Sequence, residues 1–297
     1  MAARYGLRTP DARVLMDHNN TVLHLAPLPL VAKVCDVTAR PAGPAALALE
    51  LNIALHLGRR GAPVVSPSPE LPAELHRHGD HALSFWRYQP HDPRTEVDAG
   101  AAARALLECH RALDTYRGPA TSFMDRQVAR TGRRLREPAA LRELLPADRS
   151  FLDYQLRWLV SEIRERRPPL RLLHGDPHRG NMLNVDRRCL LIDFESVCLG
   201  PLEWDLSALP GGGAGQFADI DSQLMSLVQR LRSVCVAVWC SAHAGRSPEL
   251  RRSAALHLGR LGCAASADRI VRSPDGADRR RLRTRSGAVV SARRGEP

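Results

Sequence analysis

The sequence has one lysine, few aromatic residues and no long hydrophobic run. Lys33 is the only lysine in a chain whose lysines and arginines total 43, and aromatic residues make up 4% of the chain. The core must therefore be built from Leu, Val and Ala. No segment approaches the roughly 18 consecutive apolar residues that a membrane-spanning helix needs. Because the first ten residues also lack an apolar signal segment, we expect neither a membrane protein nor a secreted one.

Disulfide and zinc patterns are also missing. The seven cysteines are scattered along the chain and include no C-x-x-C pair. This distribution is typical of small core residues in a reducing compartment rather than of a disulfide framework or a zinc site. We therefore expect a cytoplasmic protein.

Positive charge is in excess, and much of it lies at the C-terminal end. The net charge is +11, and the last thirty residues carry nine arginines against four acidic residues. A basic tail can contact nucleic acid. This one lacks interleaved aromatic residues and hydrophobic periodicity, so residues 267–297 are expected to form a solvated, disordered tail without a nucleic-acid partner.

The remaining chain changes character near residue 90. Before that point, hydrophobic patterning predicts strands over 21–25, 30–35 and 82–88 and a helix over 44–60. Beyond it, the pattern predicts helices over 98–113, 151–166 and 220–239, with a hairpin formed by 182–185 and 189–192. We therefore expect an α+β protein with a small β-rich lobe over residues 1–90 and a larger, mainly helical lobe over residues 91–266.

One polar segment carries an ordered set of functional side chains. It runs H-G-D-P-H-R-G-N from His174 to Asn181, and Asp193 follows the predicted hairpin at the end of an apolar strand. Phosphoryl transfer needs a carboxylate that orients the acceptor hydroxyl and oxygen ligands that hold Mg²⁺ against nucleotide phosphates. A loop followed by a hairpin can place Asp176, Asn181 and Asp193 at one cleft edge.

These residues resemble the aminoglycoside phosphotransferase family, which shares the two-lobed fold of eukaryotic protein kinases. The segment matches the family's H-G-D-x-x-x-x-N catalytic loop, I-D-F-E at 192–195 matches its version of the kinase D-F-G segment, and residues 200–206 match G-P-x-x-W-D-L. The resemblance implies that Asp176 is the catalytic base or hydroxyl-orienting residue and that Asn181 and Asp193 are Mg²⁺ ligands. It leaves two roles open for Asp205, which either bonds the backbone of the catalytic loop as a buried residue or takes a direct part in the chemistry.

The same resemblance assigns a nucleotide site to the small lobe. Lys33 lies in L-V-A-K-V, which is similar to the kinase V-A-I-K strand, and it would hold the α- and β-phosphates. A lone lysine in a chain that otherwise uses arginine suggests that a compact ammonium is required. Glu50, in the predicted helix, would orient Lys33. No G-x-G-x-x-G loop precedes the lysine, so a turn containing Asn20 is expected to present backbone N–H groups to the phosphates.

The sequence thus predicts an ATP-dependent phosphotransferase, with GTP as the second option, that needs Mg²⁺ and acts on a hydroxyl of a small molecule. Two alternatives remain open. The first is a kinase-fold nucleotide-binding module without catalysis. The second is a metal-dependent phosphohydrolase, which Asp176-x-His178 resembles, although the further G-D-x-x-D and G-N-H motifs of those enzymes are missing.

Overall fold

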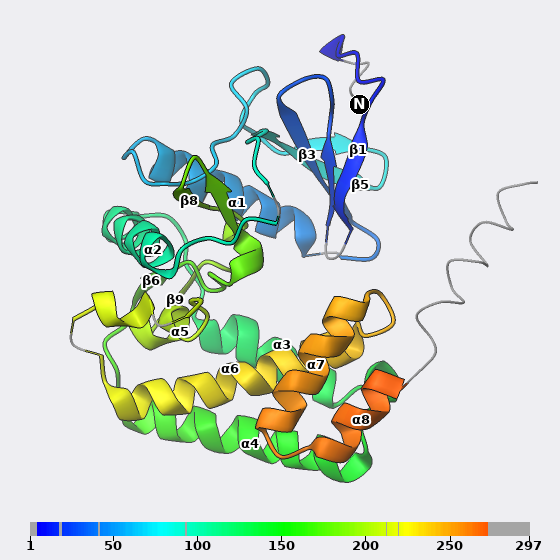
Figure 1. Ribbon diagram of the computed structural model, residues 1–297, viewed down its shortest axis with the longest axis vertical. Coiled ribbons are helices and arrows are strands. Elements are labelled where there is room, and N and C mark those ends of the chain that lie inside the picture. The colour runs from blue at the N-terminus through cyan, green and yellow to red at the C-terminus, as the bar shows by residue number, and fades with distance from the viewer. Residues whose placement is uncertain are drawn as a thin grey trace, which may run out of the picture. The chain divides into compact units, whose positions relative to one another are not determined.

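The computed structural model describes residues 5–17, 20–40, 42–92, 94–211, 213–218 and 220–272. The chain divides into two compact units. The first unit comprises Met1–Arg126 and Arg166–Val228, and the second comprises Gln127–Glu165 and Gln229–Pro297. Figure 1 shows the elements of both units.

The first unit contains a five-stranded antiparallel sheet with the strand order β1-β2-β3-β5-β4. Its central strand, β3, pairs with β2 on one side and with β5 on the other, and Lys33 lies opposite Val22 and Ser84. The strands predicted over 21–25, 30–35 and 82–88 are confirmed within two residues at each end. The bounds are β1 (Arg13–Asp17), β2 (Thr21–His24), β3 (Leu30–Asp36), β4 (His76–His78) and β5 (His81–Arg87).

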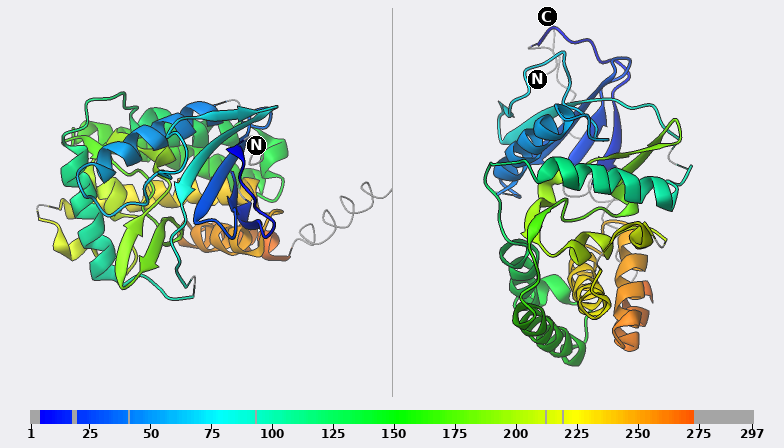
Figure 2. Two further views of the ribbon diagram at one scale, coloured as in Figure 1. Left: turned by 90° about the horizontal axis from the view of Figure 1, so that it is seen from above. Right: turned by 90° about the vertical axis from the view of Figure 1, so that its left-hand side faces the viewer.

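The helix α1 (Gly43–Gly58) packs against the sheet, as Figure 2 also shows. It begins with Pro44 in its first turn, where the missing N–H would have no partner in any case. Leu47 packs with Cys35 of β3 and Ala82 of β5, and the same buried face carries Glu50. The predicted helix over 44–60 is confirmed, and its buried face brings a carboxylate toward the central strand.

The rest of the first unit is built from one long helix and short paired strands. The helix α2 (Ala99–Leu113) is capped at its N-terminus by Asp98, whose side chain accepts a hydrogen bond from the Ala101 N–H. The predicted hairpin is confirmed as β7 (Met182–Val185) and β8 (Arg188–Leu191), with Met182 opposite Leu191. The remaining elements are β6 (Arg171–Leu173), η4 (Arg179–Asn181), η5 (Phe194–Ser196), β9 (Cys198–Gly200), α5 (Leu202–Leu206) and η6 (Gly213–Gln216).

The second unit is helical. The predicted helices over 151–166 and 220–239 are found, and the first begins earlier than expected, at Pro146. The helix α6 runs from the first unit into the second. The bounds are η2 (Met124–Val128), α3 (Ala129–Leu135), η3 (Pro138–Leu141), α4 (Pro146–Glu165), α6 (Ser222–Ala242), α7 (Pro248–Arg260) and α8 (Ala264–Arg272).

The C-terminal end differs from the sequence-based expectation. Residues 267–272, which the sequence assigns to the tail, form the end of α8, because Ala267 and Ile270 bury their side chains. The rest of the expected tail, residues 273–297, lies outside the described residues. Among the helices that the structure describes, none combines the length and the apolar character that crossing a membrane requires.

Candidate active site

Lys33 lies at the centre of an ion-pair cluster in the first unit. The strand β3 holds its side chain almost fully buried, with 8% of the residue exposed. Its Nζ lies 2.8 Å from Glu50 Oε2, 2.8 Å from Asp193 Oδ1 and 2.8 Å from Glu195 Oε1. Strand β3, helix α1 and the segment after β8 thus meet at one ammonium group. The Lys33–Glu50 pair is the one that the sequence predicts.

The charged groups of this cluster shift one another's pKa values. Burial alone would lower the pKa of Lys33, but the carboxylates of Asp193, Glu50 and Glu195 outweigh burial and raise it well above its usual value, so the ammonium stays charged. Burial raises the pKa of Glu50 above its usual range despite the neighbouring lysine. Burial would also raise the pKa of Asp193, but the neighbouring Lys33 ammonium outweighs burial and lowers this pKa below its ordinary value.

Asn20 and Arg40 extend the cluster to the turn between β1 and β2. The Asn20 Nδ2 donates a hydrogen bond to Glu195 Oε1, and the Arg40 guanidinium donates to Asn20 Oδ1 and, at 3.1 Å, to Glu195 Oε2. The Asn20 side chain therefore holds Glu195. The preceding residues His18 and Asn19 lie outside the described residues.

The loop that carries Asp176 is fixed through its backbone by Asp205. The Asp205 carboxylate is fully buried and accepts hydrogen bonds from the backbone N–H groups of His174 and Gly175, each at 2.8 Å. It also lies 2.8 Å from His110 Nε2. Burial raises the pKa of Asp205, but these donors outweigh it, so the pKa lies below its usual value. Asp205 therefore bonds the backbone of the catalytic loop, which is one of the two roles that the sequence left open.

Gly175 is required by close packing in the same loop. Its φ is +89°, and a Cβ at this position would lie 1.9 Å from the Ser196 carbonyl oxygen. Only glycine combines the left-handed backbone with this approach. The Trp204 indole N–H donates to the Gly175 carbonyl at 2.8 Å. Both the backbone N–H and the carbonyl of Gly175 are therefore hydrogen-bonded to side chains of α5.

Asn181 and Asp193 are brought together by the hairpin. The Ile192 N–H donates to the Asn181 carbonyl at 3.1 Å, which continues the ladder of β7 and β8 by one step and places Asn181 beside the residue before Asp193. The Asn181 Nδ2 donates to the Asp176 carbonyl at 2.9 Å, so the amide oxygen Oδ1 is the atom left to bind a ligand. Asp193 itself has a left-handed backbone, with φ 65°.

The donor set fits Mg²⁺. An amide oxygen and a carboxylate are hard oxygen ligands of the kind that this cation prefers. Oxygens of Glu50, Asp193 and Glu195 also lie within 4.8 Å of one another. Lys33 Nζ contacts all three of these carboxylates, so their common centre is already occupied by an ammonium. The metal position that the residues support best is therefore the one between Asn181 and Asp193.

The Asp176 side chain is about one-third exposed. Its Oδ2 lies 3.8 Å from His178 Nε2, which is beyond hydrogen-bond distance. His178 instead accepts a hydrogen bond from the Gly180 N–H at its Nδ1 and so begins the short turn η4, which leads to Asn181. The Asp176 side chain therefore keeps part of its surface accessible from outside the loop.

Sequence reasoning missed two members of this site. Glu195 lies within the quoted I-D-F-E segment, and its acidic side chain was the available signal. Arg40 lies in a polar turn whose sequence gives no sign of a partner. The expected positions Lys33, Glu50 and Asp193 form one connected cluster that also includes Asn20, and Asp176 is hydrogen-bonded to Asn181.

A buried lysine–carboxylate pair between a sheet and a helix, together with a loop aspartate and a hairpin aspartate, defines a kinase-type phosphotransferase. The sequence agrees with this class. Residues 8–223 match the model of the phosphotransferase enzyme family named APH, so the match covers well over half of the chain and the chain belongs to that family. A comparison with curated proteins gives no match.

Solved structures of small-molecule kinases share the fold. An amicoumacin kinase in complex with AMP-PNP, Ca²⁺ and Ami is 13% identical, with a TM-score of 0.63 over 86% of this chain and 88% of that one. The choline kinase LicA from Streptococcus pneumoniae is 11% identical, with a TM-score of 0.63 over 90% and 96%. A spectinomycin phosphotransferase, APH(9)-Ia, in complex with ADP and spectinomycin is 15% identical, with a TM-score of 0.56 over 91% and 92%.

Proposed function

We propose that this protein transfers the γ-phosphate of ATP, with GTP as the second option, to a hydroxyl of a small molecule. The observation that carries the proposal is the contact of Lys33 with both Glu50 and Asp193 at 2.8 Å. A lysine that touches a helix carboxylate and the hairpin aspartate is the arrangement that positions nucleotide phosphates in kinase-type sites.

Each residue then has a distinct task. Lys33 holds the α- and β-phosphates, and Glu50 keeps its ammonium in place. Asn181 and Asp193 would hold Mg²⁺, which neutralises charge on the transferring phosphoryl group when it is bound. Asp176 orients the acceptor hydroxyl and takes its proton. The partly exposed carboxylate of Asp176 and the buried Asp205 beneath its loop are both consistent with these roles.

The alternatives that the sequence left open have less support. A phosphohydrolase with two metal ions needs a carboxylate cluster free to ligate metal, but here an ammonium lies among the acidic groups of the cluster. A module without catalysis would retain nucleotide binding without a need for the partly exposed Asp176. The similar solved structures include kinases of amicoumacin, spectinomycin and choline, so we propose a small hydroxylated molecule as the acceptor.

Calorimetric titration of Mg²⁺ with AMP-PNP tests the nucleotide site. The variants are Asp193→Asn and Asp176→Asn, because asparagine tolerates the left-handed backbone of Asp193 better than alanine does. The matched control is Asp186→Asn. Asp186 lies exposed on the same hairpin and also has a left-handed backbone, with φ 49°.

We expect Asp193→Asn to weaken Mg²⁺-dependent binding by about tenfold or more, since a charged metal ligand is lost. Asp176→Asn should keep nucleotide affinity and lower turnover of any accepted hydroxyl by roughly 10²- to 10⁴-fold. Asp186→Asn should match the wild type in both measurements. Absence of nucleotide binding by folded wild-type protein would overturn the proposal, and equal loss of affinity in both site variants would contradict the separate roles.

A further inference from the structure

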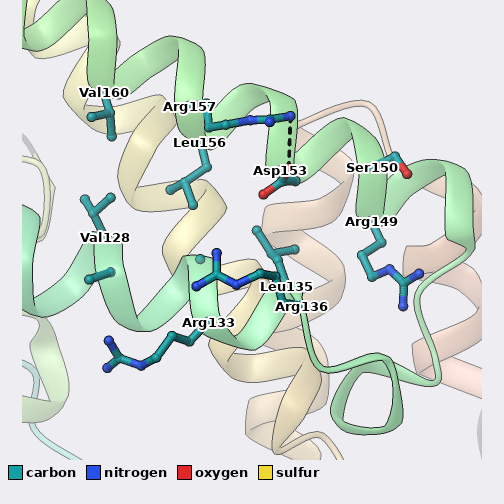
Figure 3. A pocket seen from close by; sticks show the side chains of 12 residues that line it. Val128, Arg133, Leu135, Arg136, Arg149, Ser150, Asp153, Leu156, Arg157 and Val160 are labelled. Atoms are coloured by element: carbon teal, nitrogen blue, oxygen red, sulfur yellow. Dashed lines mark ion pairs between the residues drawn. The ribbon is translucent and has the colours of Figure 1, made fainter.

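The second unit contains a groove that the proposed chemistry does not use. It lies between α3 and α4, has a volume of about 760 Å³, and is lined by residues of the second unit alone (Figure 3). Its apolar lining comes from Val128 and Leu135 on one side and from Leu156 and Val160 on the other. This volume lies within the range of small-molecule sites.

Four arginines also line the groove. Arg133 belongs to the last turn of α3, and Arg136 follows directly after that helix. Arg149 and Arg157 come from α4. The only acidic lining residue, Asp153, pairs with Arg157 at 3.0 Å, as the dashed line in Figure 3 marks. Within the part of the chain that the structure describes, no carboxylate pairs with the other three arginines. The lining therefore carries three cations that an anion could neutralise.

A glycine also lines the groove. Gly132 lies inside α3, where glycine is unfavourable relative to alanine. A Cβ at this position would lie 3.6 Å from Arg136 Nη1 and 3.6 Å from Leu156 Cδ2, which are ordinary contacts. A larger side chain would extend into the groove. Gly132 therefore lines the groove without a side chain of its own.

We infer that this groove binds a small organic anion with an apolar body and a carboxylate or phosphate group. The apolar lining suits the body, and the arginines suit a planar or tetrahedral anion because their forked donors bind such groups in pairs. None of the lining residues is aromatic, so nucleic-acid bases would find no stacking surface. The inference is independent of the proposed phosphotransferase activity, whose residues all belong to the first unit.

The probe is 8-anilinonaphthalene-1-sulfonate, an aromatic anion whose fluorescence rises on apolar surfaces. The uncharged N-phenyl-1-naphthylamine serves as the matched probe, since it has the same body without the sulfonate. Titration into the full-length protein should give a dissociation constant for the anion about tenfold lower than for the neutral probe. Salt at about 0.5 M should weaken binding of the anion and spare the neutral probe. Equal affinities for the two probes would overturn the inference.

Variants test whether the two probes bind in the groove. The double variant Arg133→Gln/Arg149→Gln should weaken binding of the anionic probe about tenfold or more, and Gly132→Leu should abolish binding of both probes by filling the space. The matched control is Arg164→Gln, which removes the same charge from an exposed position of α4 outside the groove. Circular dichroism checks that each variant is folded. If folded Arg133→Gln/Arg149→Gln binds the anionic probe like the control, the inference is wrong.

Displacement of the probe identifies the anionic group. Decanoate offers a carboxylate and 1-naphthyl phosphate offers a phosphate monoester, while inorganic phosphate offers the anion without an apolar body. Displacement by one of the two organic anions, at concentrations where inorganic phosphate has no effect, supports the inference and names the class. The inference is contradicted if neither organic anion displaces the probe. It is also contradicted if inorganic phosphate displaces the probe as well as the organic anions do.

Discussion

The hydrogen bonds of Asp205 predict a large loss of stability when its charge is removed. In Asp205→Asn, one acceptor oxygen becomes an NH₂ group that must face one of the buried donors. Those donors are the backbone N–H groups of His174 and Gly175 and the His110 ring, all at 2.8 Å. Removal of one partner from a buried charged interaction costs about 3–5 kcal/mol, so we expect the free energy of unfolding to fall by that amount.

Urea denaturation followed by circular dichroism at neutral pH measures this loss. The matched control is Asp114→Asn. Asp114 is about half exposed and binds Arg171 through both carboxylate oxygens at 2.8 and 2.9 Å, so its replacement should cost less than about 1 kcal/mol. The m-value should stay unchanged in both variants.

The pH dependence follows from the lowered pKa of Asp205. Its contribution to stability is present above the ordinary pKa of an aspartate and is lost as the pH falls through the lowered folded-state value. The difference in stability between the wild type and Asp205→Asn should therefore shrink in strong acid. A loss at neutral pH no larger than that of Asp114→Asn would refute the reasoning.

Two further variants test backbone and titration effects. Gly175→Ala should cost about 3 kcal/mol or more in urea denaturation, because its Cβ would meet the Ser196 carbonyl, whereas Gly259→Ala, with open space around a helical position, should gain about 0.5–1 kcal/mol. Burial, aided by the nearby Arg260, lowers the pKa of His257 to about 4. Between pH 6.5 and 4, His257 is therefore protonated in the unfolded chain but stays neutral in the folded protein. The free energy of unfolding falls as the pH is lowered across this range. His257→Gln should show a smaller fall, and an identical profile would contradict the burial argument.

Elements with strong periodicity were predictable from the sequence, and helices with few buried residues were not. The strand 30–35 is a short apolar run that only Lys33 interrupts, and α1 buries Leu47, Leu51 and Ala54 at helical spacing. In α7, by contrast, only Leu250, Ala254 and Leu258 are buried among arginines and small residues. Such a segment becomes helical because other parts of the fold pack against its narrow stripe of buried side chains. The local sequence does not show that these packing partners exist.

The candidate site shows the same division. Asp176, Asn181 and Asp193 could be predicted because their order along one segment reflects their placement by one loop and one hairpin. The contact of Arg40 with Glu195 joins positions far apart in the chain. Both residues are charged, and neither lies in a strand or an α-helix, so many arrangements satisfy the local sequence. Only the folded chain shows that the turn after β3 reaches the segment after β8.

Because the chain has a single lysine, covalent labelling of lysine side chains reports on Lys33 alone. A reagent that acylates primary amines finds one such side chain, and that amine lies among three carboxylates that keep it protonated. Its rate of covalent labelling therefore reports how often the surrounding ion pairs open. A ligand that covers Lys33 would slow the reaction, and loss of Glu50 would speed it. One modified position in a peptide map thus records the state of the entire cluster.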